Sequence, residues 1–235
     1  MKEFIKNHKA LFISVGFFLL FVLFTILVKF VDVAAIGPNG SSVGFASMNK
    51  WFHDLTGVTF ALYTVTDIAS IVTVPIGCIF LVVGIVEWIK RKNMFKVDSN
   101  ILALGLFYIL VLATYLVFEF LKINYRPVLI EGKLEPSFPS STTVLSLTFF
   151  ISAIDQTLIY VKNRKLKLSL IIVAVVVSIF LVVGRIISGV HWLSDIIGAL
   201  LISTALLFAY YELKKAMLKV NNIQEEKEIK NSERV

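Results

Sequence analysis

The sequence predicts an all-α, polytopic membrane protein with six transmembrane helices and one short interfacial helix. Hydrophobic residues make up 57% of its 235 residues, charged residues only 17%, and the mean hydropathy is +0.86. Soluble domains are closer to half apolar and about a quarter charged. The apolar residues also gather in runs of roughly 20, the length that a helix needs to cross a bilayer. Composition and the length of the apolar runs therefore both indicate a polytopic membrane protein.

Six apolar runs give the expected spans, which cover 11–30, 68–88, 101–123, 142–161, 168–187 and 192–211. The second run allows an extension back to position 58, and Pro75 and Gly77 are expected to kink it. Residues 43–55 are too short to span. Their large apolar side chains recur at helical spacing, at Phe45, Met48, Trp51 and Phe52. This pattern indicates an amphipathic helix lying in the membrane interface.

We expect residues 1–213 to form a single transmembrane domain, whose motif-bearing part runs from 122 to 211. The basic start of the chain and the apolar run after it resemble a signal peptide. The run is too long for one, however, and no small-residue cleavage site follows it directly, so we expect a retained helix. Residues 214–235 are expected to be a charged cytoplasmic tail, which begins as a helix end and continues as disordered chain.

The distribution of Lys and Arg predicts how the chain crosses the membrane. Of the 23 such residues, 17 lie in the N-terminus, in the connections after the second and fourth spans, and in the C-terminus. The positive-inside rule places these segments in the cytoplasm, and the loops 31–58 and 124–140 and the turn 184–191 outside. Since the net charge of +7 comes from these blocks, we expect a cell-membrane protein among membrane lipids, with no nucleic-acid partner. The single Cys78 excludes an intrachain disulfide.

The strongest candidate site lies between the fifth and sixth apolar runs and contains Arg185, His191 and Asp195. His191 and Asp195 are four residues apart, so on a helix they share a face. A carboxylate there can hold the proton of one ring nitrogen and leave the other nitrogen free to attack or to accept a proton. Arg185 supplies a forked cation that suits phosphate oxygens. The alternative is a set of polar residues that tethers a helix end to the interface.

Two further stretches fall on the same expected face of the membrane. Lys122 and Arg126 close the third span, and they could point at one anion or snorkel to lipid headgroups. The fourth span opens with three hydroxyl side chains, Ser140, Ser141 and Thr142. Free N–H groups and hydroxyls at a helix start either bind an anion or form an ordinary N-cap. Together with the histidine–aspartate pair, these groups describe a phosphate pocket with a nucleophile.

With these residues in place, the chain resembles the type 2 phosphatidic acid phosphatase superfamily, which includes the vanadium haloperoxidases. That family's pattern has three parts in order: Lys-x6-Arg-Pro, then Pro-Ser-Gly-His, then Ser-Arg-x5-His-x3-Asp. Arg185, His191 and Asp195 match the third part, with Gly184 in place of its serine. The resemblance covers about 100 residues, from Lys122 through the sixth span, and the six-span layout agrees with it.

The first two parts of the pattern are met only partly. Arg126 and the proline after it match the end of the first part, but Glu119 stands at its lysine position and the nearest lysine is Lys122. In the second part, residues 139–142 read Pro-Ser-Ser-Thr, so Thr142 stands where the family has its acid histidine.

The resemblance implies an integral-membrane lipid phosphatase that acts at the outer leaflet. His191 would attack phosphorus and form a phosphohistidine, and Asp195 would orient the ring. The phosphate group would be bound by Arg185, Arg126, Lys122, Ser140, Ser141 and Thr142. No cofactor and no metal are implied, and His191 and Asp195 without a third ligand do not make a typical metal site.

Two other functions remain open at this point. A catalytically impaired relative that binds a lipid phosphate headgroup or a partner protein is favoured by Thr142 and by the missing lysine, because departures from a motif weaken the inference drawn from it. A vanadate-dependent peroxidase is the least favoured, since nothing suggests bound vanadate and the setting is a bilayer.

Thr142 also predicts the kind of substrate. A departing lipid alcohol needs a proton, which a threonine hydroxyl is too weak an acid to supply, and general-acid help is worth about 10²–10⁴ in rate. A departing phosphate monoester has a second pKa of only about 6 and needs that help less. We therefore expect a lipid diphosphate, such as an isoprenyl diphosphate, to be preferred over a phosphate monoester. Four other residues near the same face could supply a proton: His53, Asp67, Glu131 and Glu135.

Overall fold

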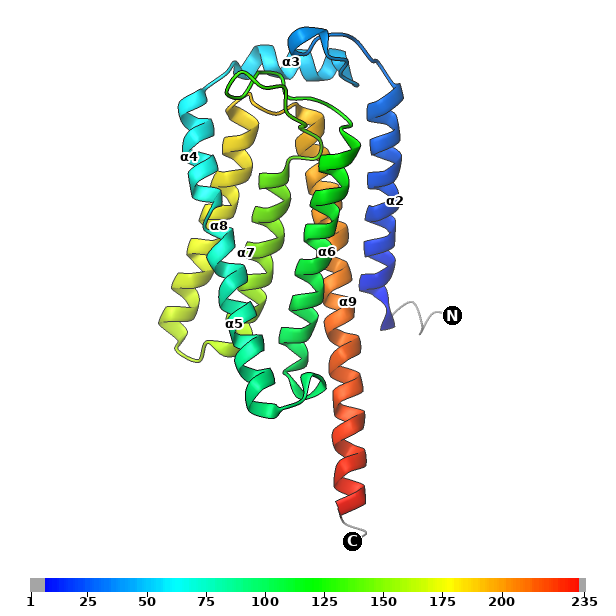
Figure 1. Ribbon diagram of the computed structural model, residues 1–235, viewed down its shortest axis with the longest axis vertical. Helices are drawn as coiled ribbons and strands as arrows, with labels where there is room; N and C mark the ends of the chain where they lie inside the picture. The colour runs from blue at the N-terminus through cyan, green and yellow to red at the C-terminus, as the bar shows by residue number, and fades with distance from the viewer. Residues whose placement is uncertain (1–6, 233–235) are drawn as a thin grey trace.

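The structure is a computed structural model that describes residues 7–232, and within that range it is a bundle of long helices (Figure 1). The elements in order are α2 (Lys9–Phe30), η1 (Pro38–Gly40), α3 (Ala46–Thr56), α4 (Phe60–Ser70), α5 (Thr73–Arg91), η2 (Met94–Lys96), α6 (Ser99–Leu121), α7 (Ser141–Tyr160), α8 (Arg164–Ile187) and α9 (Leu193–Ser232). Six segments are long and apolar enough to cross a membrane when α4 and α5 count as one. The predicted fold class is confirmed.

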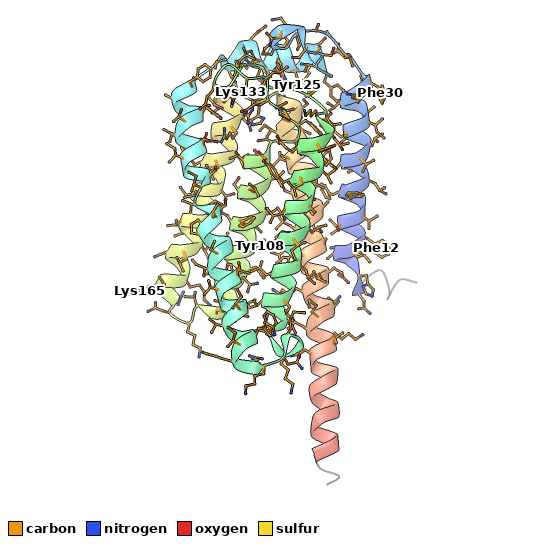
Figure 2. All side chains as sticks on the ribbon, in the orientation of Figure 1. Phe12, Phe30, Tyr108, Tyr125, Lys133 and Lys165 are labelled. Carbon is orange, nitrogen blue, oxygen red and sulfur yellow. The ribbon has the colours of Figure 1, made fainter. Side chains whose placement is uncertain are left out.

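The outward faces of these helices are apolar, as a lipid environment requires. Phe120 is 89% exposed, and Leu19 and Ile89 are exposed by more than half. Side chains project outward along the length of the bundle, among them Phe12 and Phe30 of α2 (Figure 2). In water such a surface would be costly, at roughly 25 cal/mol per Å² of apolar area. The protein is therefore a multi-pass membrane protein.

The core lies where α2, α6, α7 and α9 meet, and it is built largely from aromatic rings. Phe138, from the loop between α6 and α7, is 2% exposed and stacks on Phe21 of α2, with 6.1 Å between the ring centroids. A Cβ on Gly198 of α9 would lie 2.5 Å from the Phe138 ring, so a glycine is needed for this approach. These contacts fix the loop that carries part of the candidate site.

The second span is interrupted, but not where the sequence suggested. The break lies at Ile71 and Val72, between α4 and α5, whereas Pro75 falls in the first turn of α5. The missing N–H of a proline costs nothing there, because the first N–H groups of a helix have no partner within the helix. The Thr73 hydroxyl donates to the Ser70 carbonyl at 2.8 Å and satisfies one of the groups freed by the break.

α9 is longer than the expected sixth span. It continues without interruption to Ser232, so the expectation of a disordered tail is wrong for the described residues up to that point. Lys214 donates to both carboxylate oxygens of Asp155 on α7 at 2.7 Å, and the Tyr210 hydroxyl donates to the same carboxylate. These contacts tie the end of the span to the bundle and pair the one acidic residue of α7. Residues 233–235 lie outside the described range.

α3 is the predicted interfacial helix, and it lies across one end of the bundle (Figure 1). Trp51 and Leu55 on one side are 63% and 69% exposed. On the other side, buried Asn49 accepts from the Ser194 N–H at 3.0 Å and donates to the Ser194 hydroxyl at 2.9 Å. We call the end covered by α3 and the 122–140 loop the site end; Lys133 lies there and Lys165 toward the opposite end (Figure 2).

Candidate active site

The turn between α8 and α9 places His191 at the site end. α8 ends at Ile187, and Gly189 adopts φ 67°, a backbone conformation that other residues rarely take. A Cβ there would lie 1.8 Å from the Gly57 carbonyl oxygen, so the backbone after α3 passes directly against the turn. The Thr59 N–H also donates to the Ser188 carbonyl at 3.0 Å. The turn is thus held by the chain that leads into α4.

The His191 ring is held from both sides. Its Nδ1 lies 3.4 Å from Asp195 Oδ2, and its Nε2 lies 3.2 Å from Arg126 Nη1. An arginine can only donate, so Nε2 must accept and carry a lone pair. The ring proton therefore sits on Nδ1, facing Asp195. This is the tautomer in which Nε2 can attack an electrophile.

The environment of His191 also keeps the ring neutral. Burial is the largest cause that holds its pKa well below the ordinary value of 6.5, and the positive charges of Arg126 and Arg185 lower the pKa further. At neutral pH the imidazole is uncharged, so no proton has to leave before Nε2 can act as a nucleophile.

Asp195 is fully buried in the first turn of α9 and is fixed by the backbone around it. Its Oδ2 accepts the Trp192 N–H at 2.9 Å, in the manner of a capping box at a helix start. Its carbonyl accepts the Ser140 N–H at 3.1 Å. The starts of α7 and α9 are therefore joined beside the histidine, and the carboxylate has little freedom to leave Nδ1.

Arg126 reaches His191 from a hairpin-like loop. Its N–H donates to the Glu135 carbonyl at 3.0 Å, while a tight turn at Glu131 and Gly132 reverses the chain. The backbone pairing also brings the two side chains together, with 3.2 Å between Arg126 Nε and Glu135 Oε2. One guanidinium thus contacts both the histidine and a carboxylate.

Arg185 is 1% exposed and is held by α4. Its Nη2 lies 2.5 Å from Asp67 Oδ1, and its guanidinium carbon lies 4.8 Å from the centre of the Tyr63 ring. The Arg126 guanidinium lies 5.8 Å from the same ring. Tyr63 therefore serves both arginines as a π surface, which favours a cation by about 0.5–2 kcal/mol.

Several buried donors around the histidine have no hydrogen-bond partner among the described residues. They include Nε and Nη1 of Arg185, Asn124 Nδ2 and Ser137 Oγ. An unsatisfied buried polar group costs about 1–3 kcal/mol, and more when it is charged. A set of cationic and neutral donors gathered in one place is what an anion with several oxygens would satisfy.

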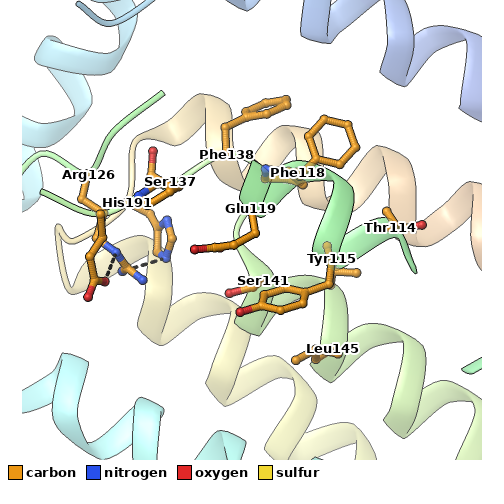
Figure 3. A pocket seen from close by; sticks show the side chains of 14 residues that line it. Thr114, Tyr115, Phe118, Glu119, Arg126, Ser137, Phe138, Ser141, Leu145 and His191 are labelled. Atoms are coloured by element: carbon orange, nitrogen blue, oxygen red, sulfur yellow. Dashed lines mark hydrogen bonds and ion pairs between the residues drawn. The ribbon is translucent and has the colours of Figure 1, made fainter. Parts of the chain in front are cut away.

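A cavity of about 270 Å³ opens beside His191, between α6, α7 and the 122–140 loop (Figure 3). One part is polar and the other is apolar, which matches a ligand with a charged head and an apolar chain. The polar lining comes from Thr114, Glu119, Arg126, Glu135, Ser137, Ser141 and His191. The apolar lining comes mainly from Tyr115, Phe118, Phe138, Val144 and Leu145.

The structure brings most of the predicted site residues together. His191, Arg126 and Ser141 line the cavity, and Asp195 and Arg185 are buried next to the histidine. Two others support the wall of the site or lie beside it: Ser140 is buried at the start of α7, and Thr142 is half-buried and does not line the cavity. Lys122 is exposed at the end of α6 and lies outside the lining.

Other site residues had no role in the sequence-based interpretation. Tyr63 and Asn124 carry no recognisable motif, and only their contacts in the fold show that they belong here. Glu119 was recognised only as a departure from the lysine position, yet it lines the cavity. Within residues 7–232, no three His, Cys, Asp or Glu side chains come together as metal ligands would.

A search of solved structures shows the same fold. The structure matches the first transmembrane PAP2 type phosphatidylglycerolphosphate phosphatase from Bacillus subtilis, with a TM-score of 0.57 and 18% identity, over 87% of this chain and 97% of that one. Among curated proteins, subunit K of NADH-quinone oxidoreductase from Helicobacter pylori is 31% identical over 61 residues. That match spans 26% of this chain and 55% of the subunit, so the activity of the whole subunit does not transfer.

The sequence profile of the PAP2 superfamily matches residues 10–217, nearly the whole membrane domain. This match confirms the resemblance seen in the motifs, and it includes every residue placed around the cavity. The chain belongs to the PAP2 superfamily.

Proposed function

We propose that this protein is an integral-membrane phosphatase that hydrolyses a lipid phosphate or diphosphate through a phosphohistidine at His191. The observation that carries the proposal is the state of the His191 ring. Asp195 Oδ2 lies 3.4 Å from Nδ1, burial and the two arginines lower the pKa of the ring, and the Nε2 lone pair faces Arg126 at the wall of an amphipathic cavity. A buried neutral imidazole in this arrangement is suited to nucleophilic attack.

The cavity supports a lipid as substrate. Its polar part surrounds His191 and Arg126, and its apolar part lies between Phe118 of α6 and Leu145 of α7. A phosphate group bound at the first part would leave the acyl or prenyl chain against the second. The Bacillus subtilis protein with the same fold is described as a phosphatidylglycerolphosphate phosphatase, which supports the same class of substrate.

The reaction follows from the contacts around Nε2. An incoming phosphate takes the Arg126 N–H groups, which frees the Nε2 lone pair. Nε2 attacks phosphorus, the P–N bond forms and the bond to the lipid oxygen breaks. Asp195 stabilises the cationic ring that results. Arg126, Arg185 and the N–H groups at the start of α7 stabilise the charge on the phosphoryl oxygens. Each step uses groups of the chain itself, and we propose a metal-independent reaction.

We place the active site at the outer leaflet of the cell membrane, with both termini in the cytoplasm. The support is the distribution of charge over the fold. The basic connections lie at the end opposite to the site end, so the positive-inside rule puts the cavity outside. Lipid phosphates presented at the outer leaflet would then reach His191 without crossing the bilayer.

Purified protein in detergent micelles, given phosphatidic acid, tests the proposal. We expect release of phosphate that vanadate inhibits and a chelator of divalent cations does not. His191→Ala should abolish release, and Asp195→Asn should slow it while the protein stays folded. A ³²P-labelled substrate should leave label on wild-type protein and none on His191→Ala. Headgroup binding without turnover by wild-type protein would instead identify a catalytically impaired relative.

A further inference from the structure

We propose that Glu119 supplies the proton chemistry that Thr142 cannot: it protonates the departing lipid oxygen and then activates the water that releases phosphate from His191. This inference rests on the phosphatase function proposed above and names one more catalytic residue for it. Glu119 stands at the lysine position of the first motif, where it places a carboxyl group instead of an ammonium group.

The other candidate acids are placed elsewhere by the fold. His53 lines a separate cavity against Trp192, with 5.5 Å between the ring centroids. Asp67 is ion-paired with Arg185, and Glu131 lies in the exposed turn of the 122–140 loop. None of these three acids lines the cavity beside His191.

Two carboxyl groups do line that cavity, and their surroundings differ. Glu135 lies 3.2 Å from Arg126 Nε and is held there by the paired backbone of its loop. The Glu119 side chain forms no hydrogen bond or ion pair within the described part of the chain. A carboxyl that is not engaged by a cation can take up and give back a proton without first breaking an ion pair. Glu119 is therefore the better proton carrier of the two.

The position of Glu119 suits the bond that breaks. It projects from the last turn of α6, and its carboxyl group points toward His191 (Figure 3). It thus lies where the polar part of the cavity meets the apolar part. With the phosphate against Nε2 and the lipid chain in the apolar part, the oxygen that joins them falls at this junction.

Glu119 transfers one proton in each of two steps. In the first, the P–O bond electrons go to the lipid oxygen, which takes the proton of Glu119 and leaves as an alcohol. In the second, the Glu119 carboxylate takes a proton from water, the water oxygen attacks phosphorus, and the P–N electrons return to Nε2. One carboxyl thus acts as acid and then as base, as in retaining glycosidases.

The test measures how rate depends on the leaving group. Full-length wild-type protein and Glu119→Gln in detergent are given an alkyl phosphate and a series of aryl phosphates whose phenols grow more acidic. Loss of general-acid help should lower kcat/KM for the alkyl ester by about 10²–10⁴. It should leave the most acidic aryl ester nearly unaffected, because a nitrophenolate departs without a proton. The same variant should release a burst of nitrophenol and then turn over slowly, since water is no longer activated.

Two matched variants separate this role from a general effect of charge. Glu135→Gln removes the same charge from the same cavity, and it should change kcat/KM for all esters by the same factor. Glu131→Gln lies outside the cavity and should match wild-type protein. An equal loss on every ester in Glu119→Gln, or no loss on any, overturns the role of Glu119. The phosphatase function itself is tested separately: wild-type protein should turn over and His191→Ala should not. Failure of the Glu119 role is therefore distinguishable from failure of the phosphatase function.

Discussion

Arg185 Nη2 lies 2.5 Å from Asp67 Oδ1, although 118 residues separate the two in the chain. The arginine is buried and the aspartate is 56% exposed, so the pair joins the inside of the site to the surface of α4. Two guanidinium nitrogens, Nε and Nη1, remain without a partner among the described residues. Asp67 therefore orients the Arg185 guanidinium and leaves its Nε and Nη1 donors available for a phosphate.

We expect Asp67→Asn to lower kcat more than it raises KM. The arginine stays buried but loses the anion that orients it, and removing one partner of such a pair leaves an uncompensated charge. Steady-state kinetics on phosphatidic acid and the inhibition constant of vanadate measure the effect, and vanadate should bind more weakly. Asp67→Glu should restore part of the rate. Asp54→Asn breaks an exposed pair with Lys50 at the same end of the molecule and serves as the control.

Gly184 stands where the family pattern has serine, and the structure explains the exchange. An ideal Cβ at Gly184 would lie 2.4 Å from Thr66 Cγ2, so α4 packs against α8 through this glycine. We expect Gly184→Ser to destabilise the protein by about 1–3 kcal/mol, as overpacking does. The unfolding temperature in detergent measures the loss. Thr66→Ala in the same chain should recover most of it, and additive losses in the double variant would refute the contact.

The neutral state of His191 can be read directly, because the chain contains only three histidines. Its lowered pKa means that the ring stays uncharged as the pH falls through 6.5, where a free histidine gains a proton. Below that value the unfolded chain binds more protons than the folded one, so His191 lowers stability as the pH falls. We expect ¹⁵N spectra of labelled histidine to show one ring that remains neutral at pH 6. Titration of all three rings near 6.5 would contradict the buried site.

The substrate preference should depend on Glu119. A departing phosphate is less basic than a lipid alkoxide, so a diphosphate needs the proton of Glu119 less than a monoester does. We expect the ratio of kcat/KM for isoprenyl diphosphate over phosphatidic acid to rise in Glu119→Gln. An unchanged ratio in Glu119→Gln would show that the leaving group is not protonated by this residue.

The topology can be tested by labelling single cysteines in a Cys78→Ala background. Gly40 and Lys133 lie in the loops at the site end, whereas Met94 lies in η2 and Lys165 in the first turn of α8, at the opposite end. We expect a membrane-impermeant maleimide to label the first two positions from outside intact cells and neither of the second two. The reverse pattern would place the active site in the cytoplasm.

The sequence by itself determined the architecture and one part of the site. Runs of about 20 apolar residues define membrane helices because every backbone polar group must be satisfied inside the bilayer. The interfacial helix followed from its spacing in the same way. His191 and Asp195 could be paired from sequence because four residues separate them, and at a helix start this distance is a local property of the backbone.

Only the tertiary structure decided which distant side chains share the cavity. Arg126 meets His191, Asp67 meets Arg185, and Glu119 rather than Lys122 lines the pocket. Each of these depends on how helices pack and rotate against one another, and packing depends on close approaches such as that at Gly184. A local pattern cannot encode such contacts, because the free energy that selects them comes from surfaces that become neighbours only when the bundle forms.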